Sequence, residues 1–203
     1  RMMSKGGMTA DFRAIARHIR KLHRVIRRPK EARLTSEAGT DLTFELRGRR
    51  WVIDDTGLCH RPSQVTNLPA GEIFIAPLEG RTQGKMVVDG SFHAIPERPV
   101  EIVVKDGVAE KITYAPAMVK QMRQAGPETF RVAELGFGVN PAARVIGNVL
   151  EDGKALGTVH VSFGDNTAMG GKLQAPFNRD AVVLNPTLEV DGKLIIDKGE
   201  MRY

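Results

Sequence analysis

With 203 residues, 41% of them hydrophobic, the chain is long enough for one large or two small domains with a hydrophobic core. Its single cysteine, Cys59, excludes an intramolecular disulfide and argues against a thiolate metal cluster. Because it also lacks an apolar run long enough to cross a bilayer, we expect a cytoplasmic protein without a membrane partner.

Basic charge is concentrated in the N-terminal segment. Residues 1–50 carry 14 Lys and Arg against 5 Asp and Glu, whereas the remainder carries 16 against 19. The basic positions are not interleaved with aromatic residues of the kind that stack on bases. This pattern favours a solvated helix face or an acidic partner surface, and we expect no nucleic-acid partner.

The first predicted element is an amphipathic helix over residues 9–28. Apolar residues recur in it at helical spacing, with Arg and Lys between them: Phe12, Ile15, Ile19, Leu22 and Ile26. Pro29 ends the helix because proline lacks the N–H for the next hydrogen bond. We therefore predict a basic linker helix over residues 1–30 and a β-rich metal-binding domain over residues 31–203.

After residue 32 the pattern changes to short apolar runs separated by turn residues, which predicts strands. They are expected at 33–35, 42–47, 51–54, 72–76, 85–88, 101–104, 109–113, 158–163, 181–184, 187–190 and 193–196. Asp-Gly pairs at 106–107 and 191–192 each lie between two such runs and predict tight hairpins. Gly48 suggests a third hairpin, which would join 42–47 to 51–54.

Two shorter helices are predicted over residues 115–124 and 141–150; the second begins with proline at a first-turn position. The expected fold class is therefore α+β, a mainly antiparallel β domain with a basic N-terminal helix and two shorter helices.

Candidate metal ligands lie in four separate stretches. Glu72 and Glu134 each lie within an apolar run, where a carboxylate needs a cation or a hydrogen-bond partner. His160 interrupts a strand pattern, and Asn178 and Asp180 share one face of a later strand. Imidazole with carboxylates suits zinc, cobalt, manganese or iron(II). The alternatives are a buried ion pair or a solvated strand end for each glutamate and a satisfied core position for the histidine.

Three stretches in this order resemble a known family: residues 67–77 (NLPAGEIFIAP), 133–141 (AELGFGVNP) and 150–160 (LEDGKALGTVH). They resemble the thermophilic metalloaminopeptidases, the aminopeptidase T and aminopeptidase S family, and above all its leucyl-aminopeptidase-like branch. The resemblance runs from about Met8 to the end of the chain. It extends to 2,5-dihydroxypyridine 5,6-dioxygenase, a mononuclear iron(II) enzyme.

The aminopeptidase resemblance implies a role for each candidate residue. Glu72 is implied as a metal ligand, Glu134 as a ligand and catalytic base, and His160 as a further ligand. The closing His-x-Asp pair of the family falls on Asn178 and Asp180, so an asparagine replaces one histidine. The family's active-site tyrosine has no counterpart in the loop after His160.

The first functional hypothesis is a metal-dependent hydrolase that resembles an aminopeptidase and removes N-terminal residues from peptides, with one or two zinc, cobalt or manganese ions. The second is an iron(II) ring-cleaving dioxygenase for a small molecule, using His160 and Asp180, and the third is a catalytically inactive metal-binding remnant. The resemblance also implies a homodimer. Since relatives carry an N-terminal α/β domain and this chain begins with Arg1, we expect a fragment of a longer protein.

Overall fold

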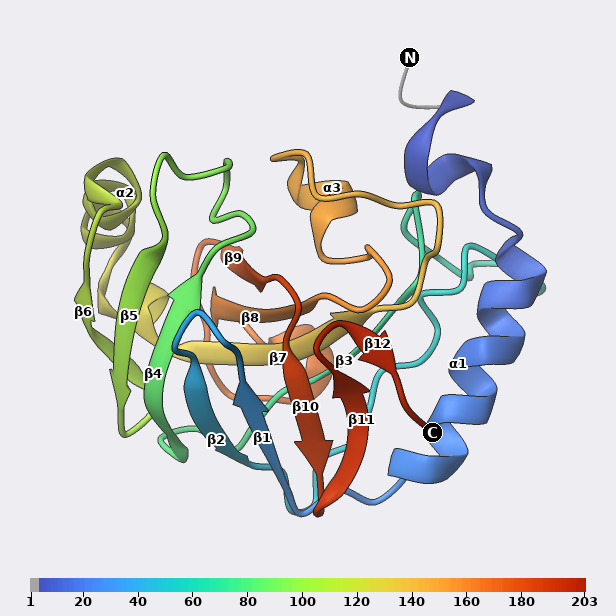
Figure 1. Cartoon of the computed structure of the whole chain (residues 1–203), viewed down its shortest axis with the longest axis horizontal. Coiled ribbons are helices and arrows are strands. Elements are labelled where there is room, and N and C mark those ends of the chain that lie inside the picture. Colours follow the sequence, from blue (N-terminus) through green and yellow to red (C-terminus); the bar gives the residue numbers. More distant parts are fainter. Residues whose placement is uncertain (1–3) are drawn as a thin grey trace.

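The chain folds into two antiparallel sheets flanked by three helices, in a computed structural model that describes residues 4–203 (Figure 1). Sheet A has the strand order β12-β11-β10-β1-β2-β4-β5-β6, and sheet B has the order β3-β7-β8-β9. This arrangement confirms the predicted α+β class.

The bounds of the elements are as follows. The helices are α1 (Phe12–Ile26), α2 (Pro116–Ala125) and α3 (Val149–Asp152), with short 3-10 turns at Gly6–Thr9, Pro127–Phe130 and Thr167–Met169. The strands of sheet A are β1 (Glu31–Thr35), β2 (Asp41–Glu45), β4 (Thr82–Val88), β5 (Val100–Lys105), β6 (Val108–Ile112), β10 (Thr187–Val190), β11 (Lys193–Asp197) and β12 (Glu200–Met201). Those of sheet B are β3 (Glu72–Ile75), β7 (Val132–Gly138), β8 (Val159–Gly164) and β9 (Asn178–Val183).

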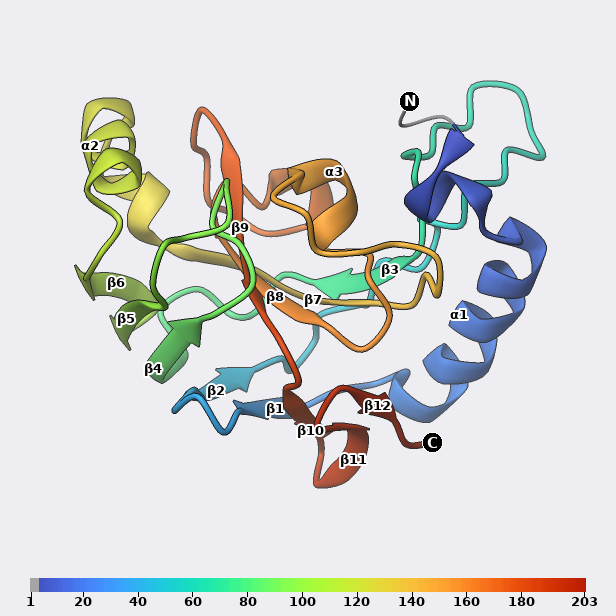
Figure 2. The same cartoon turned by 45° about the horizontal axis from the view of Figure 1, so that its top comes forward.

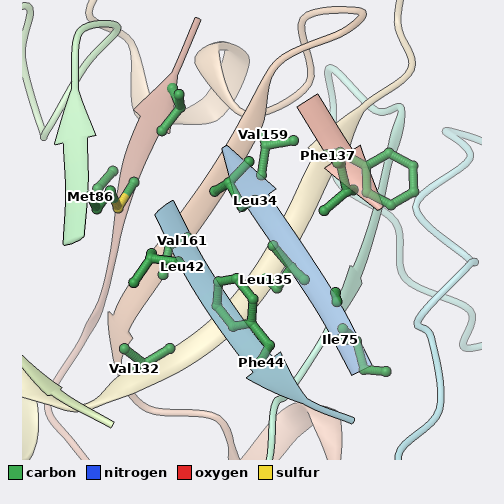
Figure 3. Packing of buried hydrophobic residues seen from close by; sticks show 14 of the residues in the cluster. Leu34, Leu42, Phe44, Ile75, Met86, Val132, Leu135, Phe137, Val159 and Val161 are labelled. Atoms are coloured by element: carbon green, nitrogen blue, oxygen red, sulfur yellow. The ribbon is translucent and has the colours of Figure 1, made fainter. Parts of the chain in front are cut away.

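The hydrophobic core lies between the two sheets. On β1 and β2, alternate residues such as Leu34 and Phe44 are buried while their neighbours are exposed. They face Leu135 and Val161 of sheet B (Figure 3). Every residue of β7 and β8 is buried, because α3 and the segment around it cover the other face of sheet B (Figure 2). That covered face holds the polar residues described below.

Helix α1 forms within the predicted range. The Asp11 side chain accepts hydrogen bonds from the backbone N–H groups of Arg13 and Ala14, which caps its start. Most of its apolar side chains are buried, while Phe12 and Val25 are half-buried, and the indole N–H of Trp51 donates to the carbonyl of Ile26 at 2.9 Å. That this segment is a linker stays a prediction, and residues 1–3 of it lie outside the described part of the chain.

Two of the three predicted hairpins are confirmed. Asp106 and Gly107 join β5 to β6, and Asp191 and Gly192 join β10 to β11, all four with positive φ between 48° and 73°. The third hairpin is wrong, since β2 pairs with β1 and β4. Residues 51–54 form no strand; Val52 makes an isolated bridge to Phe74 of β3.

The predicted helix over residues 141–150 is also wrong, because the turn that begins at Asn140 does not continue past its first residues. The Asn140 side chain accepts from the N–H groups of Ala142 and Ala143, as a helix N-cap does, but Glu151 accepts from the N–H of Arg144, which would make the first intrahelical bond, and Gly147 has a φ of 80°. Only the short helix α3 forms, beginning at Val149. No helix within residues 4–203 has the length and apolar character needed to cross a membrane.

Candidate active site

The candidate residues meet on the face of sheet B that points away from sheet A. Successive side chains of a strand alternate between faces, so Leu135 and Val161 enter the core while Glu134 and His160 point outward. The strand register brings them together, since β7 pairs Glu134 with Ser162 of β8, and β8 pairs Ser162 with Asp180 of β9. Four strands therefore supply one cluster.

Within this cluster four of the five predicted residues contact one another, and the fifth, Asp180, acts on them through its charge. The imidazole Nε2 of His160 lies 3.1 Å from Glu134 Oε1 and 3.8 Å from Glu72 Oε2. The Asn178 amide N–H donates to Glu134 Oε2 at 3.1 Å. Asp180 accepts a hydrogen bond of 2.6 Å from the hydroxyl of Ser162, and its charge acts on His160 and Glu134. The convergence expected from the sequence is present.

Two glycines make room for the imidazole ring. A Cβ added to Gly136, which pairs with His160 across the strands, would overlap the ring at Nε2. A Cβ added to Gly153, which follows α3, would lie 3.1 Å from Nδ1 on the other side. The ring is therefore held in a slot between backbone segments, and 1% of the His160 residue is exposed.

Sequence reasoning missed two charged members of the cluster, Lys154 and Asp55. The Lys154 ammonium lies 3.0 Å from Glu72 Oε1, with both side chains under 10% exposed. Asp55 is also buried, and its Oδ2 accepts from the backbone N–H of Gly71 at 2.9 Å. Lys154 stands in the third stretch of the resemblance, but nothing in that pattern shows that its charge turns inward.

The Glu134 and His160 pair retains protons. Burial raises the pKa of the Glu134 carboxyl, and the hydrogen bond from His160 opposes this only in part. Burial lowers the pKa of the His160 imidazole, but the hydrogen bond to Glu134 and the negative charges of Asp180 and Glu72 outweigh it and raise the pKa to about 9. Because both groups hold protons more tightly than usual, the pair carries at least one proton at neutral pH.

In the ion pair of Lys154 with Glu72, burial and neighbouring charges again act in opposite directions on the pKa. Burial lowers the pKa of Lys154, but the charge of Glu72 and then that of Asp55 reverse the effect and raise it. Burial and the charge of Glu72 raise the pKa of the Asp55 carboxyl to about 7. The cluster thus balances its carboxylates with two internal cations, Lys154 and protonated His160.

These residues, as placed, do not fit an iron(II) centre, for which two imidazoles and a carboxylate are typical ligands. The cluster offers one imidazole, and Asn178 directs its N–H group toward Glu134. An ammonium group already neutralises Glu72. Across residues 4–203, no group of three or more His, Cys, Asp or Glu side chains is arranged to hold a metal ion. The assignment of the five residues as metal ligands stays a prediction.

Known proteins resemble this chain over most of its length. A protein from Pseudomonas putida KT2440 named 2,5-dihydroxypyridine 5,6-dioxygenase is 22% identical over an alignment 197 residues long, which covers 87% of this chain and 55% of that protein. A solved structure titled as the 2,5-dihydroxypyridine dioxygenase of the same strain has a TM-score of 0.84 at 19% identity and covers 97% of this chain and 61% of its own.

The structure of wild-type AmpT from Thermus thermophilus has a TM-score of 0.72 at 18% identity. The match covers 96% of this chain and 56% of the AmpT chain. At this identity the likeness shows a shared fold, so the predicted aminopeptidase resemblance holds for the fold alone. This chain spans a little over half the length of these relatives. The family model described as NicX, 2,5-dihydroxypyridine 5,6-dioxygenase, matches residues 8–203. The chain therefore belongs to the 2,5-dihydroxypyridine 5,6-dioxygenase family.

Proposed function

We propose that the cluster binds a hydroxylated nitrogen heteroaromatic ring of the 2,5-dihydroxypyridine class and accepts a proton from one of its hydroxyl groups. The family supports the ligand class, since both the family model and the related Pseudomonas protein are named for this substrate. The contact of 3.1 Å between Glu134 and His160 carries the proposal, because it places a proton-sharing pair at the centre of the cluster.

The cluster opens toward solvent along β9. Asn178 and Asp180 are half-buried, whereas Glu134 and His160 behind them are buried. The carbonyl Oδ1 of Asn178 is buried and has no hydrogen-bond partner among the described residues. A buried acceptor without a partner is unfavourable, and a ligand N–H or O–H group would satisfy it.

The charges indicate how a bound hydroxyl would react. Glu134 accepts the proton in its carboxylate form, and its raised pKa brings it nearer to that of a weakly acidic hydroxyl. The nearby positive charges of His160 and Lys154 then stabilise the ring oxyanion. In this proposal Glu134 has the role of base that the aminopeptidase resemblance implied.

We do not propose ring cleavage by this chain, since the residues as placed do not fit iron(II). The aminopeptidase hypothesis has less support than the dioxygenase family, because its likeness is one of fold. This chain covers a little over half of its relatives, so the activity of any longer protein is a separate proposal.

The test is a titration with 2,5-dihydroxypyridine in the presence of a chelator. Binding is monitored through the change in absorbance when the ring loses its proton. We expect saturable binding with a deprotonated spectrum, and at least about ten-fold weaker binding by Glu134→Gln, equivalent to about 1.4 kcal/mol. The control is Glu128→Gln, a surface glutamate on a 3-10 turn that pairs with Arg131. No spectral change, or equal binding by both variants, would overturn the proposal.

A separate measurement addresses the metal. After incubation with iron(II), the wild-type protein should consume no oxygen with this ligand. Iron-dependent oxygen uptake that is lost in His160→Gln would refute the metal-free interpretation and leave the ligand class intact.

A further inference from the structure

A second candidate site lies at the opposite end of the molecule from the cluster. The C-terminal end of α1 and residues 47–51 enclose a cavity of about 710 Å³, which we call the cationic groove. Its basic lining comprises Arg27, Arg28, Lys30, Arg47, Arg49 and Arg50, together with His23, and no acidic residue lines it. Figure 1 shows this end of α1 at the lower right and α3, which covers the cluster, at the top.

Most of this positive charge is uncompensated. Arg49 pairs with Glu79, and Arg47 approaches Glu45 at 3.9 Å. Arg27, Arg28 and Arg50 are exposed, and none of them makes an ion pair within the described part of the chain. Because like charges repel, gathering them around one cavity is unfavourable unless an anion joins them.

The helix dipole explains only part of this arrangement. The negative end of α1 attracts cations, which accounts for Arg27 and Arg28 just beyond Ile26. Arg50 is not on the helix and comes to the groove from a separate segment. Two unrelated stretches of chain therefore supply charge of one sign to one cavity.

The two walls of the groove are fixed to each other. The buried indole of Trp51 donates to the carbonyl of Ile26, and the N–H of Leu46 donates to the carbonyl of Lys30 at 2.7 Å. The guanidinium of Arg49 donates to the carbonyl of Gly170 at 2.8 Å. The contacts of Trp51 and Leu46 hold the walls in place before any ligand binds, which favours affinity.

We propose that the cationic groove is a binding site for a small polyphosphate, such as the phosphate chain of a nucleotide. Arginine guanidinium groups bind phosphate oxygens through two parallel hydrogen bonds, and at least three arginines here have no other ion pair. The cavity is larger than a single phosphate needs and falls within the usual range for small-molecule sites. This proposal does not depend on the function proposed for the cluster.

Calorimetry with sodium tripolyphosphate at low ionic strength tests the site. The groove variant R28S/R50S is compared with R13S/R20S, which removes two exposed arginines from the preceding turns of α1 and so changes the net charge equally. We expect saturable binding of one tripolyphosphate by the wild type and at least about ten-fold weaker binding by the groove variant, because charge-assisted hydrogen bonds are lost. The control variant should bind within about two-fold of the wild type.

Two results would overturn the proposal: equal weakening in both variants, which indicates diffuse charge, and no saturable binding by the wild type. A third arm uses single-stranded RNA. RNA that binds more tightly than tripolyphosphate, and whose binding is lost in R13S/R20S but kept in R28S/R50S, would be a ligand of the α1 surface. In that case the assignment of the groove is wrong. Unchanged thermal unfolding of both variants shows that each is folded.

Discussion

Replacing Asp55 by asparagine should stabilise the fold at alkaline pH and leave it nearly unchanged in acid. Asp55 is buried, one carboxyl oxygen accepts from Gly71, and the other has no hydrogen-bond partner among the described residues. Burial, followed by the charge of Glu72, raises the pKa of this carboxyl from its ordinary value of 3.8 to about 7. The folded state therefore disfavours the charged form.

The size and sign of the effect follow from this pKa. Between pH 3.8 and about 7 the folded protein binds more protons at Asp55 than the unfolded chain does, so stability falls as the pH rises through this window and is level above it. The full difference is worth about 4 kcal/mol as an upper bound. An asparagine keeps an oxygen for Gly71 and carries no charge, so the variant should recover part of this free energy at pH 8.

Urea unfolding of Asp55→Asn at pH 4 and pH 8 measures both ends of this window. The neighbouring Asp54 is exposed, and Asp54→Asn provides a matched control that should change stability by less than about 0.5 kcal/mol at either pH. Equal changes in Asp55→Asn at both pH values, or a loss of stability at pH 8, would refute the reasoning about Asp55.

Three further predictions concern other positions. Gly136→Ala should displace the His160 ring, destabilise the fold by about 1 to 3 kcal/mol and weaken ligand binding; unchanged urea unfolding and titration would show that the ring has room to move. Asn178→His adds a second imidazole beside Glu134 and should tighten cobalt(II) binding at least about ten-fold in a competition assay, and unchanged affinity would mean that the cations Lys154 and His160 still exclude the metal ion. Trp51→Phe removes the hydrogen bond to Ile26 and should lower the free energy of unfolding by about 1 kcal/mol, a change that denaturant titration resolves.

Local patterns predicted most of the fold. The period of apolar residues identified α1, and the two Asp-Gly pairs identified their hairpins, because each signal depends on a few neighbouring residues. The segment over residues 141–150 escaped this reasoning. Asn140 caps a first turn there, but the N–H of Arg144 binds the side chain of Glu151 and Gly147 has a positive φ, and a propensity for helix does not reveal such competition.

The membership of the cluster was predictable only in part, and its chemistry was not. Isolated charges within apolar runs identified Glu72, Glu134 and His160, since such groups need partners. The identity of each partner depends on residues that are distant in the sequence and are brought close by the fold. Lys154 reaches Glu72 across 82 residues of sequence, and this contact provides the positive charge for which a metal ion had been expected.

The pairing of β1 bears on how the chain is synthesised. This strand lies between β2, which follows it closely in the sequence, and β10, which does not begin until residue 187, so that Leu34 pairs with both Leu42 and Leu188. Until residues 187–190 emerge, β1 of the nascent chain keeps one open edge, and its apolar residues Ala32 and Leu34 lie beside that edge. Premature termination a few residues short of β10 would make that edge permanent, and such products should aggregate.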